Sequence, residues 1–307
     1  MTWWQTSELQ GYLDVALAHL NEAADASETE SPTRMCELYF LALCTLWNGF
    51  ARHTLDPPPA DTPRFISLLR TISEDARTIL RKSEALKNLE ELTPEILDHS
   101  VLKSGRHRSG QVMTDSLRNE ASQRHRDLRD ACSASIDEEP GTRADRVLTK
   151  LAELLLVVRS NIVHGEKTPG GPDSEKAARD DEVSALVVPL QKTIIEFLFD
   201  QPGQRLVAYG TLRPGGSNEG MLKDVAGHWQ PCSVRGTVDE RHSLKCFRWQ
   251  PRGVAVEAML FTAAGLADAW ERLDRFEGNE YARHLIPVET NGLRLIANIY
   301  EARFVEE

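Results

Sequence analysis

The pattern of apolar residues changes near residue 200, and this change constrains the fold more than any other feature of the chain. Before it, apolar residues recur at helical spacing, as in Leu148, Leu151, Leu155, Val158 and Ile162. After it come short alternating runs that are typical of strands. A chain of 307 residues also has room for two domains of ~150 residues each. The sequence therefore predicts a helical domain over residues 1–200 and a second domain over 201–307.

Apolar stripes predict helices in the first domain, at residues 9–20, 65–80, 148–162 and 183–197. Residues 56–63 hold four prolines, so a helix cannot continue through them and they are predicted to form a loop. Gln201-Pro202-Gly203-Gln204 is a plausible linker between the domains. We expect the first domain to be an all-α helical bundle.

Strand-like runs dominate the second domain, at residues 205–209, 253–261, 281–289 and 293–304. Asn291-Gly292 joins the last two runs, which predicts a hairpin with a type I′ turn. A helix over roughly 263–276 interrupts the strands. The fold class of the whole chain is therefore α+β, with helices first and a small mixed domain after them.

Charge and apolar content exclude several classes of protein. Residues 1–200 hold 23 Lys+Arg against 33 Asp+Glu, and residues 201–307 hold 13 against 14, so most of the net charge of −11 lies in the helical domain. This acidic balance argues against broad, non-specific binding of nucleic acid. No apolar run reaches the ~20 residues that a membrane-spanning helix needs. Without a visible secretory signal, and with five scattered cysteines, the chain is expected to be cytoplasmic and not membrane-bound.

A glycine-containing loop follows the first predicted strand. The segment Tyr209-Gly210-Thr211-Leu212-Arg213-Pro214-Gly215 breaks the apolar run at Gly210, which permits a tight turn. The backbone N–H groups of such a loop are free to point at an anion. An ordinary strand-to-loop turn has the same signature, so this stretch alone leaves both interpretations open.

Glu277 lies on the apolar face of the predicted helix, in one arc with Leu266, Trp270 and Leu273. It also falls in the last turn, where Gly278 would end the helix. Burial and the negative end of the helix dipole both raise the pKa of a carboxyl, toward values that suit a general base near pH ~7. The alternative is that the helix ends earlier and Glu277 faces water.

Together these motifs form an ordered set: strand-Tyr-Gly-Thr-Leu-Arg, then Arg235-Gly236, then Leu-Asp-x-Phe-Glu-Gly-x-x-Tyr-x-Arg at 273–283, and the final hairpin. This set resembles the gamma-glutamylcyclotransferase-like family over about 205–304. The resemblance implies a small mixed α/β barrel with one cavity, in which Glu277 is the catalytic acid and base. It implies substrate-binding roles for six further residues: Tyr209, Gly210, Thr211, Leu212, Tyr281 and Tyr300.

The implied reaction converts a small γ-glutamyl amine or peptide to 5-oxoproline and a free amine. The α-amine of the γ-glutamyl group attacks its own γ-carbonyl, so no second reactant has to be bound. The amine is mostly an ammonium at pH 7, so a base must first remove a proton. The reaction needs no metal and no organic cofactor.

A second candidate site lies in the helical domain, where Arg159-Ser160-Asn161-Ile162-Val163-His164 ends the third stripe. Arg159 can hold a phosphate and His164 can move a proton, which RNA cleavage requires. On an ideal helix the two side chains point ~140° apart, so they converge only if the helix ends nearby or two subunits combine. The alternative is that both side chains bind the carbonyls at a helix C-terminus.

With the aromatic segment 46–50 and Arg64-Phe65, this motif resembles the HEPN superfamily over about 34–199. The resemblance implies a helical bundle, commonly a homodimer, that in many members is a metal-independent ribonuclease. Arg159 and His164 would then be the catalytic pair, with Asn161 as a polar assistant. Two alternatives to a cyclotransferase stay open. The first is a ribonuclease of toxin or defence type that acts on RNA and whose C-terminal domain senses or restrains it. The second is a non-catalytic dimerisation or interaction module at the N-terminus.

Overall fold

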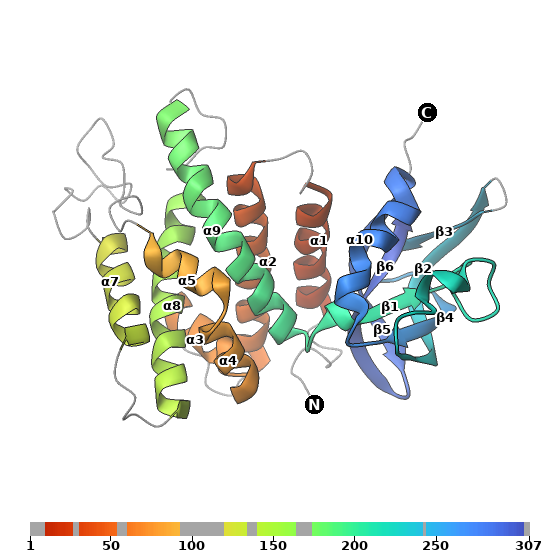
Figure 1. Ribbon diagram of the computed structural model, residues 1–307, viewed down its shortest axis with the longest axis horizontal. Coiled ribbons are helices and arrows are strands. Elements are labelled where there is room, and N and C mark those ends of the chain that lie inside the picture. Colours follow the sequence, from red (N-terminus) through yellow and green to blue (C-terminus); the bar gives the residue numbers. More distant parts are fainter. Residues whose placement is uncertain are drawn as a thin grey trace. The chain divides into compact units, whose positions relative to one another are not determined.

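The computed structural model describes residues 10–26, 31–53, 60–92, 120–133, 140–163, 174–241 and 244–303. Its Cα atoms group into two compact units, one of residues 26–198 and one that joins residues 1–25 to 199–307 (Figure 1). The predicted division at residue 200 therefore differs from the observed one at the N-terminus, because the first helix groups with the C-terminal strands. No helix among the described residues is both long enough and apolar enough to cross a membrane.

The unit of residues 26–198 is helical. Its longest helices are α2 (Pro32–His53), α8 (Pro140–Val163) and α9 (Ser174–Leu198), and α2 packs along α9 while α8 packs against α7 (Glu120–Ser133). Shorter helices α3 (Asp61–Leu69), α4 (Glu74–Arg81) and α5 (Glu84–Glu91) cover these long ones. Large side chains fill the centre, among them Phe40, Trp47 and Phe65, which are fully buried.

The stripe at residues 65–80 forms two helices, not the single helix that the periodicity predicted. The chain turns at residues 70–73, and the side chain of Ser73 accepts a hydrogen bond from the N–H of Ala76, which caps α4. Ile79 is consequently 54% exposed although it continues the stripe. A capping serine starts a new helix here while the apolar spacing carries on across the break.

The second unit is built on a closed β-barrel. Its strands are β1 (Arg205–Ala208), β2 (His228–Arg241), β3 (Leu244–Trp249), β4 (Val254–Thr262), β5 (Tyr281–Thr290) and β6 (Leu293–Ala302). Strands β2, β4, β1, β6 and β5 lie side by side in this order, and the additional pairing of β5 with β2 closes the barrel. Strand β3 pairs with β2 on the edge opposite β4. All pairings are antiparallel except that of β1 with β6.

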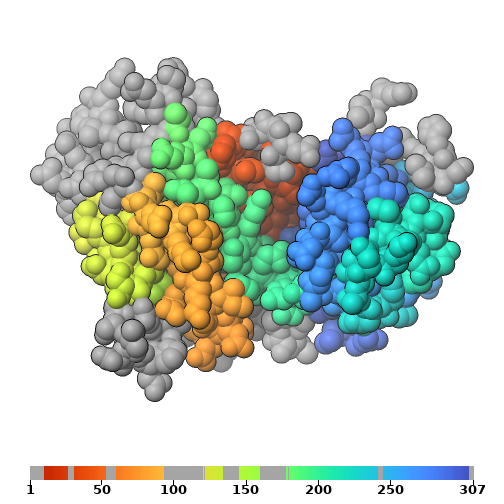
Figure 2. All heavy atoms as spheres, in the orientation of Figure 1, coloured from red at the N-terminus to blue at the C-terminus, as the bar shows by residue number. Residues whose placement is uncertain are grey.

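Two groups of buried side chains hold the barrel together. Val207, Leu260, Ile286 and Ile299 belong to the apolar group that fills its interior. Helix α10 (Leu266–Glu277) lays its own apolar face, including Leu273, on a second group contributed by β1, β4 and β6. In the space-filling view, the segment that follows β1, in teal, lies directly against α10, in blue (Figure 2).

Several predicted elements of this unit are confirmed. The last two strands form the expected hairpin, and both turn residues have positive φ angles, 49° at Asn291 and 74° at Gly292, as a type I′ turn requires. Residues 202–204 are part of the packed unit and do not act as a free linker. The indole N–H of Trp270 donates a hydrogen bond to the carbonyl of Gly203, and the Asn298 amide donates to that of Pro202.

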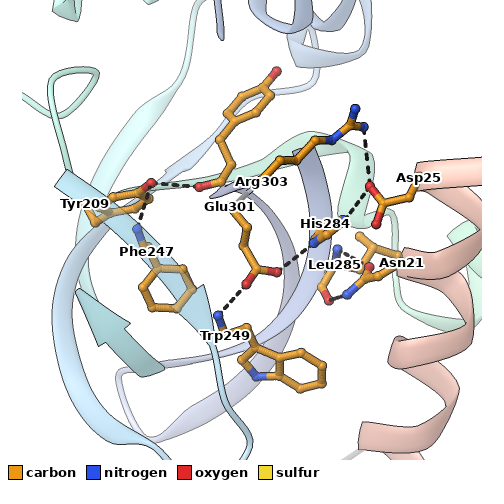
Figure 3. Close-up of polar contacts among 10 residues, drawn as sticks. Asn21, Asp25, Tyr209, Phe247, Trp249, His284, Leu285, Glu301 and Arg303 are labelled. Atoms are coloured by element: carbon orange, nitrogen blue, oxygen red, sulfur yellow. Dashed lines mark hydrogen bonds and ion pairs between the residues drawn. The ribbon is translucent and has the colours of Figure 1, made fainter. Parts of the chain in front are cut away.

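Helix α1 (Gln10–Ala26) belongs to the barrel unit through polar contacts with β5 and the residue after β6 (Figure 3). The side-chain amide of Asn21 accepts from the N–H of Leu285 at 2.8 Å and donates to its carbonyl at 3.0 Å. Asp25 lies 3.1 Å from the ring of His284 and 3.4 Å from Arg303. One side chain thus satisfies both backbone groups of a strand residue, which fixes the helix to that strand.

His284 connects this helix to the barrel wall. Its Nδ1 lies 2.7 Å from Glu301, whose other oxygen accepts a hydrogen bond from the N–H of Trp249 (Figure 3). Burial alone would lower the pKa of His284, but the hydrogen bond to Glu301 and the Asp25 carboxylate outweigh it and hold the pKa above its usual value. The ring therefore lies between two carboxylates at the contact of α1 with the barrel, and both favour its protonated form.

Candidate active site

A cavity of about 400 Å³ opens where β1 ends and α10 ends. It brings together all seven residues that the sequence predicted for this domain: Tyr209, Gly210, Thr211, Leu212, Glu277, Tyr281 and Tyr300. They come from the loop after β1, the last turn of α10, the start of β5 and the end of β6. The volume suits a small ligand.

The loop after β1 is held in shape by its own polar groups. Asn218 contacts Thr211 twice, since its backbone N–H donates to the Thr211 carbonyl and its side-chain amide donates to the Thr211 hydroxyl, both at 3.0 Å. The N–H of Gly216 donates to the carbonyl of Arg213 at 2.9 Å. The N–H groups of Gly210, Thr211 and Leu212 have no acceptor among the residues that the structure describes. They are therefore available to a ligand.

Glu277 ends helix α10 and lines the cavity. Gly278 follows with φ of 64°, and its N–H bonds to the carbonyl of Asp274. Leu266 and Leu273 lie on the same face of this helix and are fully buried. Glu277 continues that face and lines the cavity, so it does not face open water. Burial raises the pKa of Glu277 from 4.5 to about 7.

Asp274, one turn before Glu277, anchors this end of the helix to two strands. Arg283 donates to it from Nε at 2.9 Å and from Nη2 at 3.1 Å, and the Tyr300 hydroxyl donates at 2.7 Å. The Arg283 guanidinium also stacks over the Trp270 ring, 4.4 Å from its centroid. The Asp and the Arg of the motif at 273–283 thus have a structural role, which was not predicted from the sequence.

Tyr209 is buried, and its hydroxyl is engaged within the protein (Figure 3). It donates to the carbonyl of Tyr300 at 2.9 Å and accepts from the N–H of Phe247 at 3.4 Å. Burial raises the pKa of Tyr209 well above its usual value, so the phenol stays protonated. Its hydroxyl therefore connects the end of β1 to β3 and β6. A ligand in the cavity would contact the ring or the backbone of Tyr209 and not its hydroxyl.

Replacing Tyr209 with phenylalanine is expected to lower the free energy of unfolding by about 1–3 kcal/mol, because buried backbone groups of Tyr300 and Phe247 lose their partner. Urea denaturation of the full-length protein measures this. Tyr281→Phe is the comparison, and we expect a smaller loss because that ring is only half-buried and its hydroxyl bonds to the Cys246 thiol, a weak partner. Equal stability of wild type and Tyr209→Phe would contradict this role.

Three further charged residues line the cavity that the sequence had not singled out: Arg213, Lys245 and Glu280. Lys245 lies on β3, a strand that the sequence did not predict. Tyr281 lies beside the neighbouring Cys246, and burial first, then that thiol, raises the pKa of Tyr281 to about 12. The cavity therefore carries both positive and negative side chains, and its tyrosines are neutral at physiological pH.

The second candidate site is described only in part. Arg159 lies on α8, where its guanidinium pairs with Asp61 at 3.2 Å and stacks over Trp47, 5.7 Å from the ring centroid. The predicted alternative, a contact with terminal carbonyls, is not the one observed for Arg159. The side chain of Asn161 and all of His164 lie outside the described residues. The pairing of Arg159 with His164, and the ribonuclease activity inferred from it, stay predictions.

The cavity in the wall of a small barrel, with Glu277 at its edge, describes a compact ligand-binding domain, and one comparison names a family for it. A family model described as Gamma-glutamyl cyclotransferase, AIG2-like, matches residues 206–306. This match confirms the resemblance predicted for the C-terminal domain and assigns it a cyclotransferase-like character at the level of the family. The resemblance of the helical unit to the HEPN superfamily stays a prediction.

Comparison with solved structures finds YkqA from Bacillus subtilis, with 23% sequence identity and a TM-score of 0.29. The similarity covers 33% of this chain and 36% of that one, so the chain matches about a third of the length of this relative. A comparison with curated proteins gave no match.

Proposed function

We propose that the C-terminal domain cyclises a small γ-glutamyl amine or peptide to 5-oxoproline and releases the free amine. The observation that carries this proposal is one cavity that holds both Glu277, a half-buried carboxyl with a pKa of about 7, and a loop with free backbone N–H groups. A base near neutral pH and donors for a developing oxyanion are the two catalytic elements that this reaction needs.

The proposed reaction proceeds with Glu277 ionised. Its carboxylate takes a proton from the substrate's α-ammonium, and the freed nitrogen attacks the γ-carbonyl carbon to form the new C–N bond. The loop N–H groups of Gly210, Thr211 and Leu212 support the negative oxygen that forms. Glu277 then returns a proton to the departing nitrogen as the original amide C–N bond breaks, and the second proton of the attacking nitrogen leaves to solvent or to the carboxylate.

The rate of 5-oxoproline release at saturating substrate is expected to rise with pH and to level off above about 7. Glu277 accepts a proton only when it is ionised, so below its pKa of about 7 the ionised fraction falls with each step in pH. The rate should fall about tenfold per pH unit there. A profile that is flat between about pH 5 and 8 would contradict Glu277 as the base.

The direct test of the proposed function is mass spectrometry of the purified full-length protein after incubation with γ-glutamyl amines, amino acids and short peptides. Release of 5-oxoproline in equal amounts with the free amine supports the proposal. If no member of such a panel yields 5-oxoproline while the protein is folded, the domain has another function.

A further inference from the structure

The hydrogen bonds around Asp274 determine which way the Tyr300 hydroxyl points. Tyr300 lines the cavity, whereas Asp274 lies behind it and is not among the lining residues. The Tyr300 hydroxyl lies 2.7 Å from Asp274 Oδ1. The same carboxylate receives Nε and Nη2 of Arg283 at 2.9 and 3.1 Å, so it is part of an ion pair and can only accept.

A tyrosine hydroxyl has one proton to donate and lone pairs to accept with. Because Asp274 can only accept, the single proton of Tyr300 is directed to Asp274. Burial first, then the hydrogen bond to Asp274, raises the pKa of Tyr300 far above its usual value, so this proton stays in place. What the phenol oxygen offers to a ligand in the cavity is therefore a lone pair, which can receive a donor but cannot make a hydrogen bond to a second acceptor.

We propose that Asp274 is a positioning residue, and that it makes Tyr300 the hydrogen-bond acceptor for the α-amino group of the substrate. This inference rests on the proposed function, because the α-amino group is the nucleophile of that reaction. The charge of Glu277 contributes to the raised pKa of Tyr300, so the two side chains are close enough to interact electrostatically. An amine held by Tyr300 would thus be close to the carboxylate that deprotonates it.

The rest of the cavity supports this division of roles. The free N–H groups at Gly210, Thr211 and Leu212 are donors, so they suit the oxygens of a ligand and not its ammonium. Tyr209 shares the cavity, but its hydroxyl already donates to a backbone carbonyl. Among the tyrosines that line the cavity, Tyr300 is the one whose orientation is fixed by a paired carboxylate.

Two ligands that differ only in the α-amino group test the inference without turnover. L-Glutamate carries this group and glutarate lacks it, and titration calorimetry measures the binding of each to the full-length protein. Wild type is expected to bind L-glutamate about tenfold more tightly, since a hydrogen bond to a charged group is of that order. In Asp274→Asn the amide can donate to Tyr300, which turns the phenol proton toward the cavity, and we expect the preference to fall to about twofold or less.

A matched control lies on the same helix. Arg272 of α10 pairs with Asp224 through two contacts of 2.6 and 2.9 Å, and both side chains are exposed and outside the cavity. Asp224→Asn removes an Asp–Arg pair from α10 but should leave the preference for L-glutamate unchanged. If Asp274→Asn weakens both ligands by the same factor, Asp274 has only a structural role and the inference is wrong.

Tyr300→Phe provides the second variant, should Asp274→Asn fail to fold. It removes the acceptor but keeps the ring, so it too should reduce the preference for L-glutamate. Equal binding of L-glutamate and glutarate to wild type, or no binding of either, would overturn the inference whether or not the protein releases 5-oxoproline. A wild-type protein that prefers L-glutamate but releases no 5-oxoproline from any γ-glutamyl compound would instead refute the proposed function.

Discussion

Replacing Glu277 with glutamine is expected to slow 5-oxoproline release by on the order of 10²–10⁴-fold, the usual contribution of a general acid and base. Glutamine keeps the size of the side chain at the end of α10 but cannot take the proton from the substrate amine. The loss should appear mainly in kcat, because the loop that would bind the substrate is untouched. Kinetics with the best substrate of the γ-glutamyl panel measure it.

The fold of the Glu277→Gln variant should be intact. The raised pKa of Glu277 means that the folded state holds this proton more tightly than the unfolded state, so this group's contribution to stability is lost as pH rises through about 7. Above that pH the neutral glutamine should be no less stable than the wild-type glutamate. Glu271→Gln is the matched control, since Glu271 is exposed on the same helix and pairs only with Arg275 in the described structure. Full activity in Glu277→Gln would refute its role as the base.

Replacing Gly216 with alanine is expected to reduce kcat/KM by about 10²-fold, because displacing catalytic groups by ~1 Å can have an effect of this size. A Cβ at this position would lie 2.1 Å from the carbonyl oxygen of Thr211 and 2.9 Å from that of Arg213. Both are backbone atoms, so the loop itself must move. The free N–H groups of Gly210 to Leu212, residues that line the cavity, would then change position.

Gly220→Ala is the control for this loop variant. Gly220 lies in the short helix η5 (Glu219–Leu222), where an added Cβ would meet nothing within 4 Å. We expect this variant to keep its activity and its circular dichroism spectrum. If Gly216→Ala is as active as Gly220→Ala, the shape of the loop after β1 does not matter for the reaction, and the N–H groups there are not its oxyanion donors.

The position of Glu277 could be predicted from the sequence because a helix is a local structure. The spacing of Leu266, Trp270 and Leu273 fixes one face, and Gly278 fixes where the helix ends. What lies opposite that face depends on strands that are distant in sequence. The roles of Asp274 and Arg283 therefore became clear only once β5 and β6 were placed beside the helix.

Strands β2 and β3 were not predicted, and their buried positions explain why. Along β2 the inward-facing residues are Cys232, Val234 and Gly236, of which only one is a strong strand former. A Cβ on Gly236 would lie 2.2 Å from the carbonyl of Arg248, so the close pairing with β3 demands glycine. At Gly236 the close approach of β3 leaves no room for an apolar side chain, which interrupts the alternation along β2.

Helix α1 shows a different limit of sequence interpretation. Its apolar stripe was recognised, but its assignment to the barrel unit was not, because Asn21 and its partner Leu285 are 264 residues apart. Polar side chains that recognise a strand backbone leave no periodic signature. Only the three-dimensional arrangement reveals that this helix and the barrel are one unit.

The discontinuous barrel unit has a consequence for how the protein is made. Helix α1 is synthesised well before His284, Leu285 and Arg303, to which it binds. Residues 26–198 lie between α1 and these partners in the chain, so they are translated in full before the barrel unit can be completed. Such distant contacts slow folding. During synthesis the helical unit therefore has time to form first, and the cavity that holds Glu277 is completed only after β5 and β6 have been made.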